Sequence, residues 1–513
     1  MPSITTPLER VADAIHPDST STIRDKINAL SSFSQSLHDV SIDQAQSVFE
    51  NIPLGSFYML FGIAEGSDEE EELNKVLCQV IRKLLDPFTY DMIAADDNNM
   101  TFLVQGLNHF SSDIRYLSLI QVEKCLNSTP QTIDQVAHSN VFSFLLATIA
   151  FQQTQTAAKA VDIATKIGVK VPEVLFSQNA SILRNLLETN ETVRFRVYEL
   201  IVRVAGSSTR AFELGETSGL LNGFINEVQS TDTLVALNAI EILRQIAVTS
   251  AGLSFLEKSN LLEHLATSLD TGDDNDTAVM LTKSATFLFF GQLAQNEEIE
   301  FGPIEQKYHY LEKLESFLDK DDTNKEILTA VIGSIGLVGS NEQGLRLLHN
   351  TPLLNKFMEM FSTTAGDIKA EFLQSLTKLM GVRTEDPAVE QMTRQVYDSM
   401  DGRPTTLDNL IQTAKQPVEN IRVAAFACMK SIASHMWGRR EMVRNEHILG
   451  YLVDRTVEHT LEGQRWKFNI AETLTTADDA QETLGDHYRI LRNYVRQGPY
   501  YRPTEPAAAL ESA

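Results

Sequence analysis

The residues of this chain that could do chemistry lack the spacings that known catalytic motifs require. A phosphate-binding loop needs glycines followed by Gly-Lys-Ser/Thr, so that backbone amides and a lysine hold the phosphates. The sequence contains no such run, no H-E-x-x-H zinc pair and no G-x-S-x-G nucleophile turn. Its 11 histidines are dispersed. These absences favour a binding protein over an enzyme.

Glycines and cysteines give no cofactor or metal signal either. The run GSIGLVG contains Gly333, Gly336 and Gly339, but no strand precedes it. Glycines spaced three apart on a helix instead predict close contact with a neighbouring helix. Cys78, Cys125 and Cys428 show neither disulfide-framework nor metal-ligand spacing. We therefore expect no cofactor, no metal and a reducing cytoplasmic or nuclear environment.

The charge of the chain excludes two classes of partner. Acidic residues number 69 and basic residues 43, which gives a formal net charge of −26. Nucleic acids and anionic membranes need clustered basic surface, so neither is expected as a partner. The N-terminus, MPSITTPLERVADAI, shows no signal-peptide pattern, and the apolar stretch SATFLFFGQLA is too short to span a bilayer. We expect a soluble protein, monomeric when free, in the cytoplasm and also the nucleus.

The element that would position any binding residues is an amphipathic helix that recurs. The segment TNETVRFRVYELIVRVAG has a polar cap at Asn190, a stop at Gly206 and an apolar stripe of helical period. The stripe consists of Val193, Val197, Leu200, Ile201 and Val204. Similar segments cover residues 111–126, 231–247, 366–379 and 418–433, with less regular copies near Gln155 and Thr323. An aliphatic residue with a basic neighbour opens many copies.

A second apolar element lies before or between these copies. It has two adjacent apolar residues and a third one turn later, as in Val141, Phe142 and Leu145. Further copies start at Ile182, Leu220, Leu261, Tyr310, Leu353 and Ile448, with a weaker one at Leu407. Both elements return about every 40 to 50 residues, a period typical of HEAT and armadillo repeats.

These repeats predict an all-α fold, a HEAT/armadillo-like α-solenoid that forms a single curved superhelical array. Each unit would bury its apolar stripe against its neighbours. We expect divergent helical repeats at residues 1–110, the repeat array at residues 111–500 and a flexible tail at residues 501–513. A generic helical protein is the alternative, but two elements that alternate in fixed order with one step argue against it.

The last helix of each repeat lines the concave face of such arrays, so its polar positions are candidates for partner binding. The candidate groove residues are Lys124, Glu199, Arg203, Glu241, Gln245, Gln374 and Lys378. Glu199 and Arg203 lie four residues apart and would alternatively pair only with each other. For Arg194 we expect a contact with a neighbouring helix.

A second candidate surface lies at the C-terminal end, where the charge changes sign. Arg489, Arg492 and Arg496 share one helical face, and Tyr500 and Tyr501 follow. Arginines late in a helix suit its negative end, which predicts a capping role. Arginines beside aromatic residues are also good interface anchors. Both interpretations stay open at this point.

Four segments resemble a known family. VRFRVYELI at residues 193–201, IGLVGSNEQGLRLL at 335–348, YLVDRTVEH at 451–459 and GPYYRP at 498–503 are similar to segments of the 26S proteasome non-ATPase regulatory subunit 5 family. The resemblance covers nearly the whole chain and is best from about residue 181 onward. It implies a HEAT/armadillo-like chaperone that assists assembly of the proteasome regulatory-particle base.

The resemblance also implies partners and a mode of action. It implies binding to C-terminal domains of ATPase-ring subunits, notably regulatory subunit 7, in a module with regulatory subunit 4 and non-ATPase regulatory subunit 2. The bound chaperone would delay docking of the ATPase tails on the core particle, and it needs no ATP site of its own.

Other binding classes remain as alternatives. A scaffold or adaptor for transport, a phosphatase or a ubiquitin ligase would have the same fold. An armadillo-type import adaptor fits poorly, since its groove needs a ladder of tryptophans and this chain has only Trp437 and Trp466.

Overall fold

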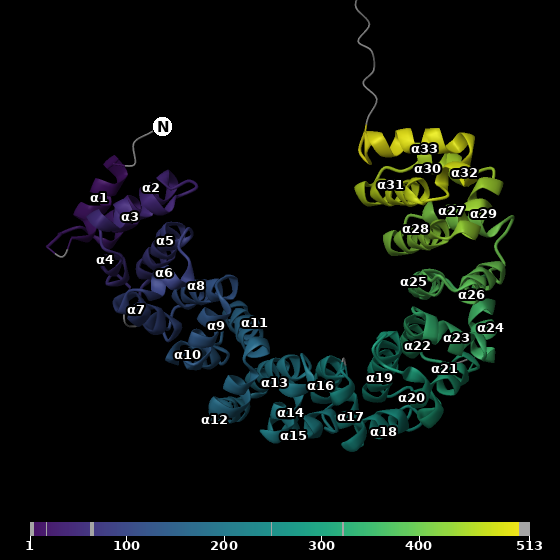
Figure 1. Ribbon diagram of the computed structural model, residues 1–513, viewed down its shortest axis with the longest axis horizontal. Helices are drawn as coiled ribbons and strands as arrows, with labels where there is room; N and C mark the ends of the chain where they lie inside the picture. The colour runs from purple at the N-terminus through teal and green to yellow at the C-terminus, as the bar shows by residue number, and fades with distance from the viewer. Residues whose placement is uncertain (1–4, 17, 62–65, 248, 321–322, 502–513) are drawn as a thin grey trace, which may run out of the picture. The chain divides into compact units, whose positions relative to one another are not determined.

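Helices form all the regular secondary structure of the computed structural model (Figure 1) within the residues it describes, 5–16, 18–61, 66–247, 249–320 and 323–501. The chain divides into two compact units, Met1–Glu227 and Val228–Ala513. This boundary falls inside the predicted array of residues 111–500. The predicted divisions at residues 110 and 500 stay predictions, and the predicted tail lies, apart from Tyr501, outside the described residues.

Unit 1 contains a row of long helices, each packed on the next, and a layer of shorter helices. The long-helix row of unit 1 consists of α2 (Ile23–Ser36), α5 (Asp68–Leu85), α8 (Ser112–Glu123), α11 (Thr154–Lys170) and α13 (Glu191–Ala205). The shorter helices are α1 (Thr5–Ile15), α3 (Ile42–Asn51), α4 (Leu54–Tyr58), α6 (Tyr90–Ala94), α7 (Asp97–Leu107), α9 (Pro130–Ala137), α10 (Asn140–Thr148), α12 (Ala180–Leu187), α14 (Thr209–Thr217) and α15 (Leu220–Val228). A 3-10 turn, η1 (Lys124–Asn127), and a π turn, η2 (Val174–Gln178), complete the unit.

Unit 2 repeats this arrangement more regularly, and its long helices lie along the concave side of that unit (Figure 1). The long-helix row of unit 2 consists of α16 (Thr233–Ile246), α19 (Thr277–Gln295), α22 (Lys325–Val338), α25 (Gly366–Met380), α28 (Glu419–Ser434) and α31 (Leu461–Thr476). The shorter helices are α17 (Ser250–Lys258), α18 (Leu261–Ser268), α20 (Phe301–Tyr308), α21 (Tyr310–Leu318), α23 (Glu342–His349), α24 (Pro352–Glu359), α26 (Pro387–Asp398), α27 (Thr406–Ala414), α29 (Met436–Arg444), α30 (Ile448–Val453), α32 (Ala480–Leu484) and α33 (Asp486–Gln497).

The two predicted elements are both present, and their apolar residues form the core. Val193, Val197 and Leu200 of α13 are buried, and Asn190 caps this helix by accepting the Val193 N–H at 3.0 Å. Val141, Phe142 and Leu145 of the second element are buried in α10. The same holds for its copies in α15, α18, α21, α24, α27 and α30, whereas Ile182 of α12 is only half-buried. The predicted all-α repeat fold is confirmed.

Each repeat of unit 2 contains a further short helix that the apolar pattern does not distinguish. These helices are α17, α20, α23, α26, α29 and α32. Among them, α23 packs on α20 and on α26, and α29 packs on α32. Helix α20 is divided from α21 by His309 alone, which has left-handed backbone (φ 50°), and α17 is divided from α18 by Ser259 and the left-handed Asn260 (φ 58°). Such a short connection changes the chain direction within a turn, so the apolar pattern continues without an obvious break.

The glycines of GSIGLVG lie where two long helices meet. Gly333 and Gly336 belong to α22 and Gly339 caps it, and all three face side chains of α25. A Cβ on Gly339 would collide with the Leu379 side chain. The predicted close helix contact is therefore confirmed.

Candidate partner-binding surface

The candidate groove residues of unit 2 lie on the long-helix row as predicted. Gln374 is exposed and Lys378 is half-buried on α25. Glu241 and Gln245 of α16 line a cleft of about 480 Å³ together with Gln292 of α19. Within this cleft Glu241 pairs with Arg244 of its own helix. The cleft thus presents amide groups and one compensated charge pair rather than a catalytic set.

Glu199 and Arg203 of α13 contact each other, as the alternative interpretation held. Arg203 Nη1 lies 3.4 Å from Glu199 Oε1, and Arg203 Nη2 lies 3.8 Å from Asp162 Oδ1 on α11. The pair therefore connects two neighbouring long helices of unit 1. Both side chains stay partly exposed, at 42% for Glu199 and 33% for Arg203, so a partner could still reach them.

Lys124 has a different position from the one predicted. It lies in η1, and its ammonium donates to the carbonyl oxygens of Leu85 and, at 3.0 Å, Phe88. Burial lowers the pKa of Lys124 to about 8. Because the last carbonyls of a helix lack intrahelical partners, this ammonium completes the end of α5. Lys124 is thus directed into the repeat stack and is not a free cation for a partner.

The basic residues that follow the aliphatic position of the recurring helix have the same internal role. Arg115 of α8 donates to the carbonyls of Leu107 and His109, and Lys369 of α25 donates to that of Phe361. Arg196 of α13 donates to the carbonyls at the end of α10, at 2.9 Å to Phe151. These cations cap the ends of neighbouring helices, so the recurring basic residues stabilise the packing of the repeats.

Arg194 of α13 also contacts a neighbouring helix, as predicted. Its Nε lies 2.9 Å from Glu227 Oε1 on α15, and both side chains are largely buried. The arginines of the segment VRFR thus serve the packing of unit 1.

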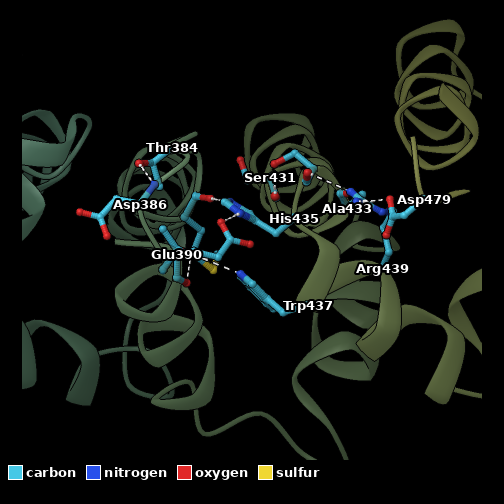
Figure 2. A network of polar contacts seen from close by, with 12 residues as sticks. Thr384, Asp386, Glu390, Ser431, Ala433, His435, Trp437, Arg439 and Asp479 are labelled. Atoms are coloured by element: carbon cyan, nitrogen blue, oxygen red, sulfur yellow. Dashed lines mark hydrogen bonds and ion pairs between the residues drawn. The ribbon is translucent and has the colours of Figure 1, made fainter. Parts of the chain in front are cut away.

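A polar joint links three consecutive repeats in unit 2 (Figure 2). His435, between α28 and α29, has Nδ1 2.9 Å from Glu390 Oε2 and Nε2 2.6 Å from the Met380 carbonyl. Arg439 of α29 donates to the Ala433 and Ser434 carbonyls at the end of α28 and pairs with Asp479 beyond α31. No local pattern in the sequence indicates this joint, because its contacts between repeats connect residues 40 or more positions apart.

The C-terminal candidate surface is exposed. Arg489, Arg492 and Arg496 project from α33, and Tyr500 and Tyr501 are 52% and 42% exposed. The cap of α33 is made by Arg455, which donates to the Gly498 carbonyl at 3.0 Å and the Pro499 carbonyl at 3.1 Å. The three arginines of α33 therefore remain available to a partner. Arg455 belongs to the segment YLVDRTVEH, but its capping role depends on Gly498 and Pro499, which are distant in sequence.

The cysteines are unsuited to nucleophilic chemistry. Burial raises the pKa of Cys125 and of Cys428 to about 12, and it raises that of Cys78 as well. At neutral pH these thiols stay protonated, and the thiol is the unreactive form. In the described part of the chain no group of three or more His, Cys, Asp or Glu side chains has a metal-binding arrangement.

No described helix combines the length and apolar character needed to cross a membrane. Whether a partner contacts the candidate residues stays a prediction, because their positions alone do not reveal one.

Two solved structures share the fold. The chain is similar to yeast importin-β (Kap95p), with a TM-score of 0.55 and 14% identity over 91% of this chain and 63% of that one. A structure of Kap95p with RanGDP gives a TM-score of 0.51 and 11% identity over 96% of this chain and 66% of that one. At such identities the likeness concerns the fold alone.

Sequence relatives give the family. Proteins named 26S proteasome non-ATPase regulatory subunit 5 are similar to this chain: the Bos taurus protein is 24% identical over 95% of this chain and 96% of its own length. The Homo sapiens protein is 23% identical over 93% and 94%, and the Drosophila melanogaster protein 23% identical over 87% of each. The family model described as Proteasome non-ATPase 26S subunit matches residues 13–513. Repeats, helix order and relatives therefore agree, and the chain belongs to the family of proteasome non-ATPase 26S subunits.

Proposed function

We propose that this chain is an assembly chaperone for the base of the 26S proteasome regulatory particle. It binds C-terminal domains of ATPase-ring subunits through its solenoid surface and delays their docking on the core particle. The observation that supports this best is membership of a proteasome-subunit family together with long helices that leave polar side chains unused by the core. Such a surface suits another folded protein.

The surface of unit 2 offers both charge signs to a partner. Gln374 and Lys378 project from α25, and Glu241 and Gln245 border the cleft beside α19. Complementary charge on a folded partner would fix its register and speed its association. In unit 1, the Glu199–Arg203 pair would offer a similar contact.

The α33 surface is the second part of the proposal. Arg489, Arg492 and Arg496 together with Tyr500 and Tyr501 form an exposed group of the residue types enriched at binding hot spots. We assign it an auxiliary contact with the same partner or with another subunit of the module.

The partners proposed are regulatory subunit 7 first, and regulatory subunit 4 and non-ATPase regulatory subunit 2 as members of the same module. No catalytic step is required of the chain, since covering a partner's docking surface is enough to delay assembly. A bound chaperone competes with the core particle by mass action.

Affinity purification of the tagged chain tests the function. The proposal expects free ATPase subunits in the eluate and little intact 26S proteasome. Recovery of transport cargo, a phosphatase or a ubiquitin ligase without ATPase subunits would instead favour a general scaffold or adaptor and would overturn the chaperone function.

Charge reversal at Glu199, Arg203 and Lys378 tests the surface. These side chains are partly exposed, so helicity and melting temperature should change little, while the Kd for an ATPase C-terminal domain should rise. Unchanged affinity in this triple variant would place the partner elsewhere on the chain.

A further inference from the structure

Among the described cations of unit 2 that lack a partner, three lie near one another: Lys378 near the end of α25, Arg383 just after it, and Lys430 on α28. None of them has a hydrogen bond, an ion pair or a cation–π contact with a described residue. Most other cations of the unit are engaged, as Lys356 is with Glu315 at 2.7 Å. Unpaired cations are unexpected on a chain of net charge −26, so their grouping calls for a ligand.

The three cations lie beside one seam between two long helices. Helices α25 and α28 pack along their lengths, and the Ser431 hydroxyl donates to the Thr377 carbonyl at 3.0 Å. Lys430 and Lys378 are the sequence neighbours of this bonded pair, and both side chains are half-exposed. Gly381, one turn after Thr377, also lies against Ser431, because a Cβ on Gly381 would be 3.5 Å from Ser431 Oγ. Arg383 follows two residues later and therefore lies near the same seam. We call Lys378, Arg383 and Lys430 the cationic seam.

A polar cavity of about 350 Å³ adjoins the cationic seam. Its lining includes Arg383 and Thr384 after α25, Ser434 at the end of α28, His435 after it, and Thr476 of α31. The cavity is large enough for a side chain of a bound segment.

The acids at this cavity already have partners within the chain (Figure 2). Glu390 Oε2 lies 2.9 Å from His435 Nδ1, and the Met380 carbonyl lies 2.6 Å from His435 Nε2. Asp479 is paired with Arg439.

The other acids near the seam make no direct contact with its cations. Glu371 precedes Lys378 by two turns of α25, and burial raises its pKa while Lys378 lowers it. Glu385 follows Arg383, and Glu472 lies on α31. Among the described residues, none of these three acids forms a direct ion pair with the seam. The three cationic head groups are therefore not held by a described carboxylate of the chain and can pair with one from a partner.

We propose that the cationic seam and its cavity bind an acidic, extended segment of a partner protein. Carboxylates of that segment pair with Lys378, Arg383 and Lys430, and one of its side chains enters the cavity. The proposal rests on the proposed function, because it specifies what the partner of the concave surface must carry. A protein segment is favoured over nucleic acid, since the surrounding acidic surface repels a polyphosphate more strongly than a short acidic peptide.

A triple variant, Lys378→Gln, Arg383→Gln and Lys430→Gln, tests the seam. Since the three side chains form no hydrogen bond or ion pair with a described residue, the variant should keep the melting temperature of the wild type. The matched control is Arg10→Gln, Lys170→Gln and Lys258→Gln, which removes equal charge from exposed side chains on α1, α11 and α17.

The probes are a fluorescein-labelled decaglutamate peptide, a labelled single-stranded oligonucleotide of similar charge and an isolated ATPase C-terminal domain. Fluorescence anisotropy at low salt should show that the wild type and the control bind decaglutamate alike. The triple variant should bind it about tenfold more weakly, as expected for the loss of three exposed ion pairs, with a smaller salt dependence.

The outcomes separate the two proposals. Equal decaglutamate binding by the wild type and the triple variant, or no binding by either, overturns the proposal that the cationic seam binds an acidic segment. This holds whether or not the ATPase domain binds. Tighter binding of the oligonucleotide than of decaglutamate overturns the assignment to a protein segment. An ATPase domain that the wild type fails to bind overturns the proposed function, while seam-dependent peptide binding would still stand.

Discussion

Gly336 of α22 lies against Ser375 of α25 so closely that a Cβ atom on Gly336 would stand 2.6 Å from the Ser375 Cα. The Ser375 hydroxyl donates to the Ile332 carbonyl at 2.8 Å across the same contact. Two long helices of consecutive repeats thus meet backbone to backbone. Such proximity depends on the absence of a side chain at position 336.

Gly336→Ala should therefore lower the stability of unit 2. The added methyl group has to push α22 and α25 apart, and overpacking of this kind costs about 1–3 kcal/mol. Urea unfolding followed by circular dichroism measures the effect as a lower transition midpoint.

Gly450→Ala is the matched control, because a Cβ at Gly450 of α30 would meet no atom within 4 Å. Alanine favours a helix over glycine by about 1 kcal/mol or less, so this variant should keep or slightly raise the midpoint. An equal fall in both variants would mean that the α22–α25 contact is not the cause.

Arg455→Met should loosen the last helix of the chain. Arg455 donates to the Gly498 and Pro499 carbonyls, and its Cζ lies 4.1 Å from the centroid of the Tyr494 ring. Without this guanidinium, the end of α33 loses its cap, and a lost charge-assisted hydrogen bond costs about 1.5–3 kcal/mol. Hydrogen exchange of residues 486–497 should become faster.

Arg489→Met serves as the comparison for Arg455, since Arg489 is exposed on α33 and has no hydrogen bond or ion pair with a described residue. Its exchange pattern should resemble that of the wild type. Protection of α33 that survives in Arg455→Met would contradict the capping role.

Lys467 predicts a pH-dependent contribution to stability. Its side chain is 1% exposed, and burial lowers its pKa to about 8, whereas an unfolded lysine has a pKa of about 10.4. Between these values the unfolded state binds more protons, so the cost of burying this lysine falls as the pH rises. The unfolding free energy of the wild type minus that of Lys467→Met should therefore increase by about 1–2 kcal/mol from pH 7.5 to 9.5.

Parallel denaturation curves of both proteins at several pH values measure this difference and cancel the titration of all other groups. A value of wild type minus variant that stays constant or falls toward pH 9.5 would show that Lys467 does not lose its proton in the folded state.

The three cysteines should differ between the folded and the unfolded chain. Cys125 and Cys428 are fully buried with pKa values raised to about 12, so iodoacetamide at pH 8 should leave both unmodified. In urea all three cysteines should react. Mass spectrometry of tryptic peptides identifies the sites, and rapid labelling of Cys428 in the native chain would contradict its placement in the core of α28.

The sequence by itself determined the helices that carry the repeat. Val193, Val197 and Leu200 recur at helical spacing, Asn190 caps their helix, and Val141 and Phe142 mark the second element. These features are local, since caps and apolar stripes depend only on residues within a few turns. The family could be inferred for the same reason, because short segments keep their order along the chain.

The tertiary structure alone decided what the polar residues do. Lys124 had the spacing of a groove residue, yet its ammonium closes the end of α5, and Arg455 closes α33 from a distant loop. Lys430 and Lys378 lie beside the same helix contact only because α25 and α28 pack together. A charged side chain either contacts a neighbouring repeat or stays accessible to a partner. Which of the two occurs depends on residues about 40 positions away in the sequence, and these come close only when the repeats stack.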